Sequence, residues 1–110
     1  MKNSLIILAN NIKFVSEILY NKPYKYNTKE NLRYYLWMCE LKLFIINKYS
    51  INVDVYPSAN FNNKYLISII KDQKVIYDTS ADYDSYESAL EAGLIETLFN
   101  NLINKFPNII

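Results

Sequence analysis

Apolar residues recur along the chain with two different periods, and each period predicts a type of secondary structure. In residues 4–20 the apolar positions are three or four residues apart, which is the spacing of an amphipathic helix. These positions are Leu5, Leu8, Ile12, Val15 and Leu19. The proline-containing stretch 21–23 is expected to end this helix.

A second helix is predicted to begin at Asn27, whose side chain can cap it while Glu30 completes a capping box. One apolar stripe of this helix consists of Leu32, Leu36, Cys39, Leu43 and Ile46. We expect this stripe to face the core, with Cys39 as a small buried apolar residue. A further apolar side consists of Trp37, Leu41 and Phe44, and we expect the first helix to cover it.

After Ser50 the period changes to two, which is typical of half-buried strands. Residues 51–57 alternate apolar and polar side chains and end at Pro57, and the polar residues 58–63 predict a turn. Residues 64–71 and 74–78 predict two more strands, joined at Asp72 and Gln73 as a short hairpin. The three strands are therefore predicted to form an antiparallel meander.

A closing helix is predicted to begin close to residue 85. Asp84 and Ser85 can cap it, Glu87 places an acid in its first turn, and Pro107 is expected to end it. Its apolar stripe is Ala89, Leu90, Gly93, Leu94, Leu98 and Leu102. Gly93 is expected to let this helix pack closely on the sheet. The pattern predicts a single α+β domain over residues 1–110, in the order α-α-β-β-β-α, with the closing helix on one sheet face.

Composition restricts the chemistry that this chain can perform. It contains no histidine, which removes the side chain best suited to proton transfer near neutral pH and excludes most zinc sites. Its only glycine lies inside a predicted helix, so the usual phosphate-binding loop is excluded. We therefore predict that the protein is not an enzyme and that it uses no cofactor and no metal.

The same composition bears on the compartment. A single cysteine, Cys39, can form no internal disulfide, which suits a reducing compartment such as a host bacterial cytoplasm. The apolar run at residues 5–9 is too short for a signal sequence or a membrane span. We therefore expect no membrane partner.

Residues 82–103, DYDSYESALEAGLIETLFNNLI, follow the predicted meander. This segment resembles the closing unit of many small phage and mobile-element proteins, in which a strand leads into an S/T-Y-E-x-A-L-x-x-G-L helix. The matching residues are Ser85, Tyr86, Glu87, Ala89, Leu90, Gly93 and Leu94. The segments SEILYNKPYKYN and YYLWMCEL also resemble these proteins. The resemblance implies a phage or mobile-element setting, in which some small proteins inhibit host defence systems, including RNA-guided CRISPR nucleases.

The predicted order of the last elements is also similar to that of a double-stranded RNA-binding domain. Those domains contact phosphates through lysines at the start of the closing helix. This chain instead has acids there, among them Asp84 and Glu87, which would repel a phosphate. The topology can therefore be shared without the binding function.

Cations and tyrosines alternate in residues 22–35, within a basic first half of the chain. The candidate contact residues are Lys22, Tyr24, Lys25, Tyr26, Lys29, Arg33 and Tyr34. Cations that neutralise phosphates beside rings that stack on bases suit single-stranded nucleic acid. Tyrosines also provide large contact areas for a protein partner. A solvated loop whose tyrosines pack on the core would have the same composition, so three interpretations stay open.

Acidic residues gather in the second half, where residues 72–96 contain one lysine, Lys74. The candidate acidic face consists of Asp82, Asp84, Glu87 and Glu91. These acids could imitate a phosphate backbone in a nuclease groove, or they could cap a helix and form its exposed side. Their spacing also permits a hard-cation site, although the EF-hand pattern is absent.

Two functions are predicted from these observations. The first is a non-enzymatic inhibitor of a host defence nuclease, which binds a CRISPR effector or its complex with guide RNA. The second is a nucleic-acid-binding accessory protein that uses residues 22–35. A homo-oligomer that associates through the Trp37 side is a third possibility.

Overall fold

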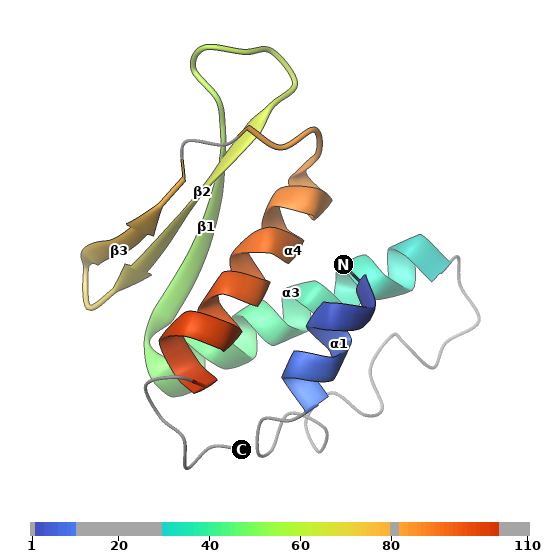
Figure 1. Ribbon diagram of the computed structural model, residues 1–110, viewed down its shortest axis with the longest axis vertical. Helices are drawn as coiled ribbons and strands as arrows, with labels where there is room; N and C mark the ends of the chain where they lie inside the picture. Colours follow the sequence, from blue (N-terminus) through green and yellow to red (C-terminus); the bar gives the residue numbers. More distant parts are fainter. Residues whose placement is uncertain (1, 11–29, 80–81, 104–110) are drawn as a thin grey trace.

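The computed structural model describes residues 2–10, 30–79 and 82–103 (Figure 1). These residues form helix α1 (Lys2–Asn10), helix α3 (Glu30–Tyr49), strands β1 (Ile51–Pro57), β2 (Tyr65–Lys71) and β3 (Lys74–Asp78), helix α4 (Tyr86–Glu96) and a π-helical segment, η2 (Thr97–Ile103). The predicted α+β class is confirmed, and the helices gather on one side of the sheet. The second half of the first predicted helix, the predicted cap at Asn27 and the predicted stop at Pro107 lie outside the described residues.

The three strands form the predicted antiparallel meander, in the order β1-β2-β3. Ile51 and Val53 of β1 point into the core and are 1% and 0% exposed. The hairpin between β2 and β3 turns at Asp72 and Gln73, whose φ angles are 52° and 67°. Two successive positive φ angles are the geometry of a type I′ turn, whose twist matches that of the strands it joins. A β-bulge beside Ile70 interrupts the pairing of β2 with β3.

Helix α4 lays its predicted apolar stripe on the sheet. Leu90 and Leu94 are 0% exposed, and the stripe continues through η2 with Leu98 and Leu102. A Cβ atom built on Gly93 would lie 2.5 Å from Cγ1 of Val53, well inside normal van der Waals contact. The close packing of α4 on the sheet that was predicted from Gly93 is therefore confirmed.

Of the two residues predicted to cap helix α4, Ser85 does so and Asp84 does not. The Ser85 hydroxyl accepts the Ser88 backbone N–H at 3.1 Å, and the Ser88 hydroxyl accepts the Ser85 backbone N–H at 3.3 Å. The two serines thus form a capping box. Asp84 instead pairs with Lys64, the residue immediately before β2. Glu87 lies in the first turn of α4, as predicted.

Helix α3 turns a different side to the core from the one that was predicted. Leu43 is 55% exposed, and Leu36 and Ile46 are each 37% exposed, so these three residues of the predicted stripe lie outside the core. Cys39 of the same stripe is half-buried and packs against the core. The buried side consists of Tyr34, Trp37, Met38, Leu41, Phe44 and Ile45, which share one core cluster with Leu5 and Ala9 of α1. These positions also recur at steps of three and four, so the period fits both sides of this apolar helix. The side of α3 that packs in the core is the one that carries three aromatic rings, those of Tyr34, Trp37 and Phe44.

Candidate functional site

The structure describes only the end of the predicted partner-binding segment. Lys22, Tyr24, Lys25, Tyr26 and Lys29 lie outside the described residues, as does the side chain of Arg33. Tyr34 lies in the core and is 8% exposed, which agrees with the interpretation that tyrosines of this segment pack on the core. Its hydroxyl donates to Oε2 of Glu91 at 2.6 Å, and its ring stacks on Trp37 with centroids 6.0 Å apart. Tyr34 therefore holds α3 against α4.

The four residues of the predicted acidic face have different surroundings. Asp84 has an 85% exposed side chain and pairs with Lys64, whose hydrogen bond lowers the pKa of that carboxyl group. Glu91 is bonded to Tyr34, whereas Glu87 is exposed and Asp82 is half-buried. Within residues 2–10, 30–79 and 82–103, no group of three acidic or cysteine side chains comes together as a metal site. Two of the four acids therefore make contacts within the fold.

The end of the predicted partner-binding segment and the predicted acidic face meet where α3 and α4 begin. One contact between them is the hydrogen bond from Tyr34 to Glu91. In addition, the ring of Tyr86 packs edge-to-face on two other rings, with its centroid 6.2 Å from that of Tyr35 and 6.1 Å from that of Tyr65 in β2. Such edge-to-face pairs add to the stabilisation that burial provides. Burial raises the pKa of Tyr35 to about 12, and a hydrogen bond with the Cys39 thiol acts in the same direction. Burial also raises the pKa of Tyr86, so Tyr35 and Tyr86 keep their protons at neutral pH.

We expect the protein to lose stability as the pH rises above 10. An unperturbed tyrosine has a pKa of 10.0, whereas the folded chain raises the pKa of Tyr35 to about 12. A raised folded pKa stabilises the native state fully below pH 10 and progressively less as the pH approaches 12. Urea unfolding at several values between about pH 8 and pH 11 measures this loss. Tyr35→Phe should decline less steeply, and a slope equal to that of the wild type would contradict the assignment to Tyr35.

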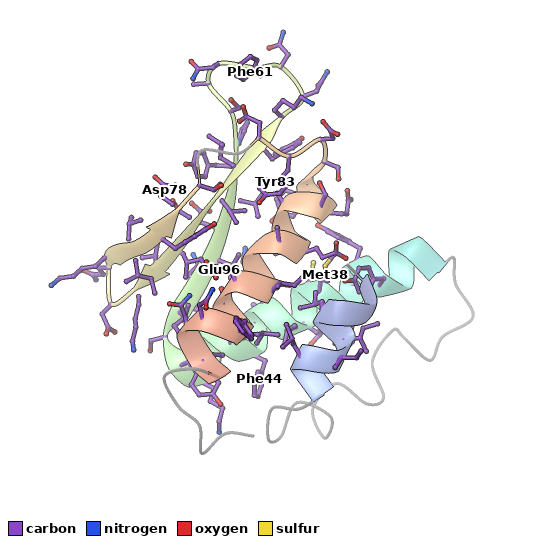
Figure 2. The ribbon with its side chains drawn as sticks, in the orientation of Figure 1. Met38, Phe44, Phe61, Asp78, Tyr83 and Glu96 are labelled. Carbon is purple, nitrogen blue, oxygen red and sulfur yellow. The ribbon has the colours of Figure 1, made fainter. Side chains whose placement is uncertain are left out.

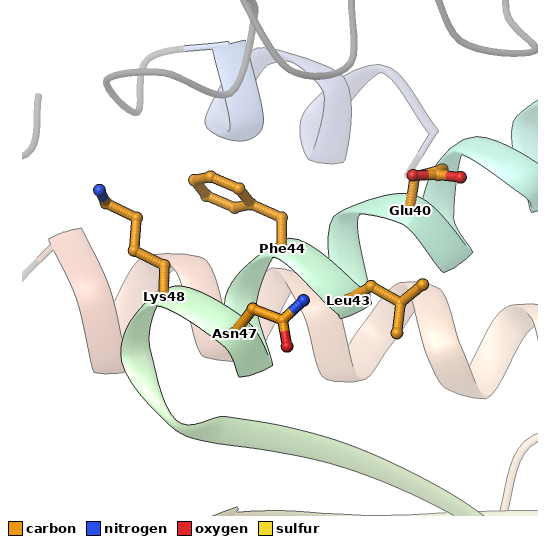
Figure 3. A pocket seen from close by; sticks show the side chains of 5 residues that line it. All are labelled: Glu40, Leu43, Phe44, Asn47 and Lys48. Atoms are coloured by element: carbon orange, nitrogen blue, oxygen red, sulfur yellow. The ribbon is translucent and has the colours of Figure 1, made fainter.

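The solvent side of α3 carries an apolar stripe, defined by Leu36, Leu43 and Ile46 and called the α3 stripe below. With half-buried Cys39 these positions follow steps of three, four and three, the spacing of a helix that packs against another helix. Beside Leu43 lies an open hollow of about 430 Å³ (Figure 3). Its described lining residues are Glu40, Leu43, Phe44, Asn47 and Lys48. An apolar centre with a polar rim is the usual anatomy of a protein contact surface.

Sequence reasoning missed Phe61, which it placed in a polar turn. Phe61 is 58% exposed and lies at the tip of the loop between β1 and β2 (Figure 2). The Ser58 hydroxyl accepts the N–H groups of Asn60 and Phe61, at 3.2 and 3.3 Å. The Ser58 N–H donates to the carbonyl of Lys64 at 2.8 Å and closes the loop. A single aromatic residue among asparagines was the available signal, because a turn needs no large apolar side chain.

A comparison of the chain with protein-family models, with curated proteins and with solved structures finds no match. Among the helices of the described ranges, none has both the length and the apolar character of a membrane span.

Proposed function

We propose that this protein is a non-enzymatic binding protein of phage or mobile-element origin that inhibits a host defence nuclease. Its most concrete target is a CRISPR effector, alone or with its guide RNA, which it blocks by stoichiometric contact in the host bacterial cytoplasm. The resemblance of residues 82–103 to small phage proteins supports the setting. The absence of histidine from the whole chain supports a role in binding.

The α3 stripe is the observation that carries this proposal. It exposes Leu36, Leu43 and Ile46 on a long helix whose other side is already packed in the core. Full burial of an aliphatic side chain is worth roughly 1.5–3 kcal/mol relative to full exposure. A partner that covers these three partly exposed residues would therefore gain about 2–4 kcal/mol, which offsets part of the cost of association. Stoichiometric inhibition requires this kind of stable contact.

The proposal is tested with the tagged protein and a nuclease-treated bacterial lysate. We expect the protein to retain a defence nuclease after nucleic acid has been digested. The retained nuclease is then purified, loaded with guide RNA and assayed for target cleavage while the protein is added. Cleavage should fall in proportion to the added protein and stop at a fixed molar ratio.

Two matched variants locate the contact. Leu43→Asp should weaken inhibition by more than about tenfold, because a carboxylate would have to be buried in the contact. Ile7→Asp makes the same kind of change at a 61% exposed residue of α1 and should leave inhibition unchanged. Retention of nucleic acid alone, lost at moderate salt, would overturn the proposal in favour of the nucleic-acid-binding alternative. Equal effects of the two variants would remove the α3 stripe as its basis.

A further inference from the structure

No helix of the described residues covers the second face of the sheet. Helices α3 and α4 pack on the face that carries Ile51 and Val53. Strand alternation places the neighbouring positions on the opposite face. The residues of this face that matter here are Asp54, Tyr56, Ser68, Ile70, Val75 and Asp78, which we call the open sheet face. Figure 2 places Asp78 well away from Met38 and Phe44.

The strand register aligns three polar residues across the open sheet face. Asp54 of β1 pairs with Ser68 of β2, and Ser68 pairs with Asp78 of β3. Because neighbouring strands are 4.7–4.9 Å apart, the backbones of the two aspartates are separated by about 10 Å. Sequence reasoning gave Asp54 no role and did not connect it with Asp78, which lies 24 positions later.

Asp78 is held in place by donors from both other strands. Tyr56 donates to Oδ1 of Asp78 at 3.1 Å, and Ser68 donates to the same oxygen at 2.9 Å. Since Tyr56 lies on β1 and Asp78 on β3, the Tyr56 side chain must extend across β2. Burial, and after it the hydrogen bond to Asp78, raises the pKa of Tyr56, so the phenol remains a donor at neutral pH. The result is an aromatic ring lying over the sheet beside an oriented carboxylate.

The chemistry of this face indicates what fits it. The two charged residues named above, Asp54 and Asp78, are both carboxylates, and apolar Val75, on the same strand as Asp78, is 59% exposed. A complementary partner must therefore supply cations and aliphatic side chains together. Arginine suits this arrangement better than lysine, because a planar guanidinium can pair with a carboxylate while it stacks on a tyrosine ring.

We propose that the open sheet face binds an arginine-bearing, aliphatic segment of a partner protein, with a guanidinium at Asp78 and the Tyr56 ring and a second cation at Asp54. This contact uses none of the residues of the α3 stripe. It therefore stands or falls independently of the proposed inhibition of a nuclease.

The experiment uses the full-length protein and a fluorescein-labelled synthetic peptide of alternating arginine and valine. Binding is measured by fluorescence anisotropy, and the contact is located by amide chemical-shift changes. We expect the arginine peptide to bind more tightly than its lysine counterpart and to shift amides of β1, β2 and β3. Asp78→Asn, which keeps an acceptor for Tyr56 and Ser68, should weaken binding by about tenfold, and Asp54→Asn by a smaller factor.

Asp72→Asn is the matched control, because it removes one negative charge from the exposed hairpin turn at the end of the same sheet. It should change the affinity by less than about twofold. Equal weakening by Asp72→Asn and Asp78→Asn would overturn the proposal in favour of general charge attraction. Equal affinity for the arginine and lysine peptides would also overturn it. Dimerisation of the protein that Asp78→Asn abolishes would place a second copy on this face instead.

Discussion

Replacing Leu41 by alanine is expected to lower the free energy of unfolding by about 2–5 kcal/mol. Leu41 is 0% exposed and belongs to the core cluster that α3 shares with α1, α4 and the sheet. Alanine would leave a cavity there, because the close-packed neighbours can relax into it only in part. This change tests directly which side of α3 faces the core.

Leu43→Ala provides the matched control for this result. It is the same substitution two positions further along α3, at a residue that is 55% exposed. Its unfolding free energy should stay within about 0.5 kcal/mol of the wild type. Urea denaturation followed by circular dichroism compares the two variants. Similar losses in both would mean that the Leu43 side also packs in the core, and would remove the α3 stripe from consideration as a binding surface.

Replacing Gly93 by alanine is expected to destabilise the protein, although alanine is the better helix former. Helix propensity favours alanine by about 1 kcal/mol. Against this, the new Cβ atom would lie 2.5 Å from Cγ1 of Val53, which is 0% exposed. Valine is stiff about its first side-chain torsion, so relief requires α4 to move away from β1. Overpacking of this kind costs about 1–3 kcal/mol, so the net loss is expected to be up to about 2 kcal/mol.

A double-mutant cycle with Val53→Ala separates the two contributions. Val53→Ala removes the Cγ1 atom that the new methyl group would meet. In that background Gly93→Ala should become neutral or stabilising, because only the propensity gain is left. The coupling energy should equal the overpacking cost of about 1–3 kcal/mol, measured by urea denaturation of the four proteins. Additive effects would show that contact with Val53 does not set the distance between α4 and the sheet.

The α3 stripe and the open sheet face differ in whether contacts within the fold hold their residues in place. The α3 stripe exposes apolar residues on one helix, and its removal should leave stability nearly unchanged. The open sheet face depends on contacts between three strands, so Asp78 contributes both to the hydrogen bonds of the sheet and to the proposed contact. This difference is why Asp78→Asn, which preserves the acceptor, is a cleaner test than Asp78→Ala.

The amino-acid sequence by itself determined the elements that have one possible arrangement. Alternating side chains in residues 51–57 allowed one core face, and the strand pattern around Asp72 and Gln73 allowed one hairpin. The apolar stripe of α4 was equally unambiguous, because polar residues occupy most of its other positions. In these elements the local period and the tertiary packing favour the same buried face and the same chain reversal.

Tertiary structure alone decided the remaining features. Helix α3 is apolar on two sides, so only the shape of the available core could select Trp37 and Leu41 over Leu36 and Leu43. The bond from Tyr34 to Glu91 joins residues 57 positions apart, and the row from Asp54 to Asp78 depends on the register of three strands. Local periodicity records which side chains share a face within one element. Local periodicity carries no information about which residues of another element lie opposite. Those pairings depend on helix packing and strand register, which are determined by the whole fold.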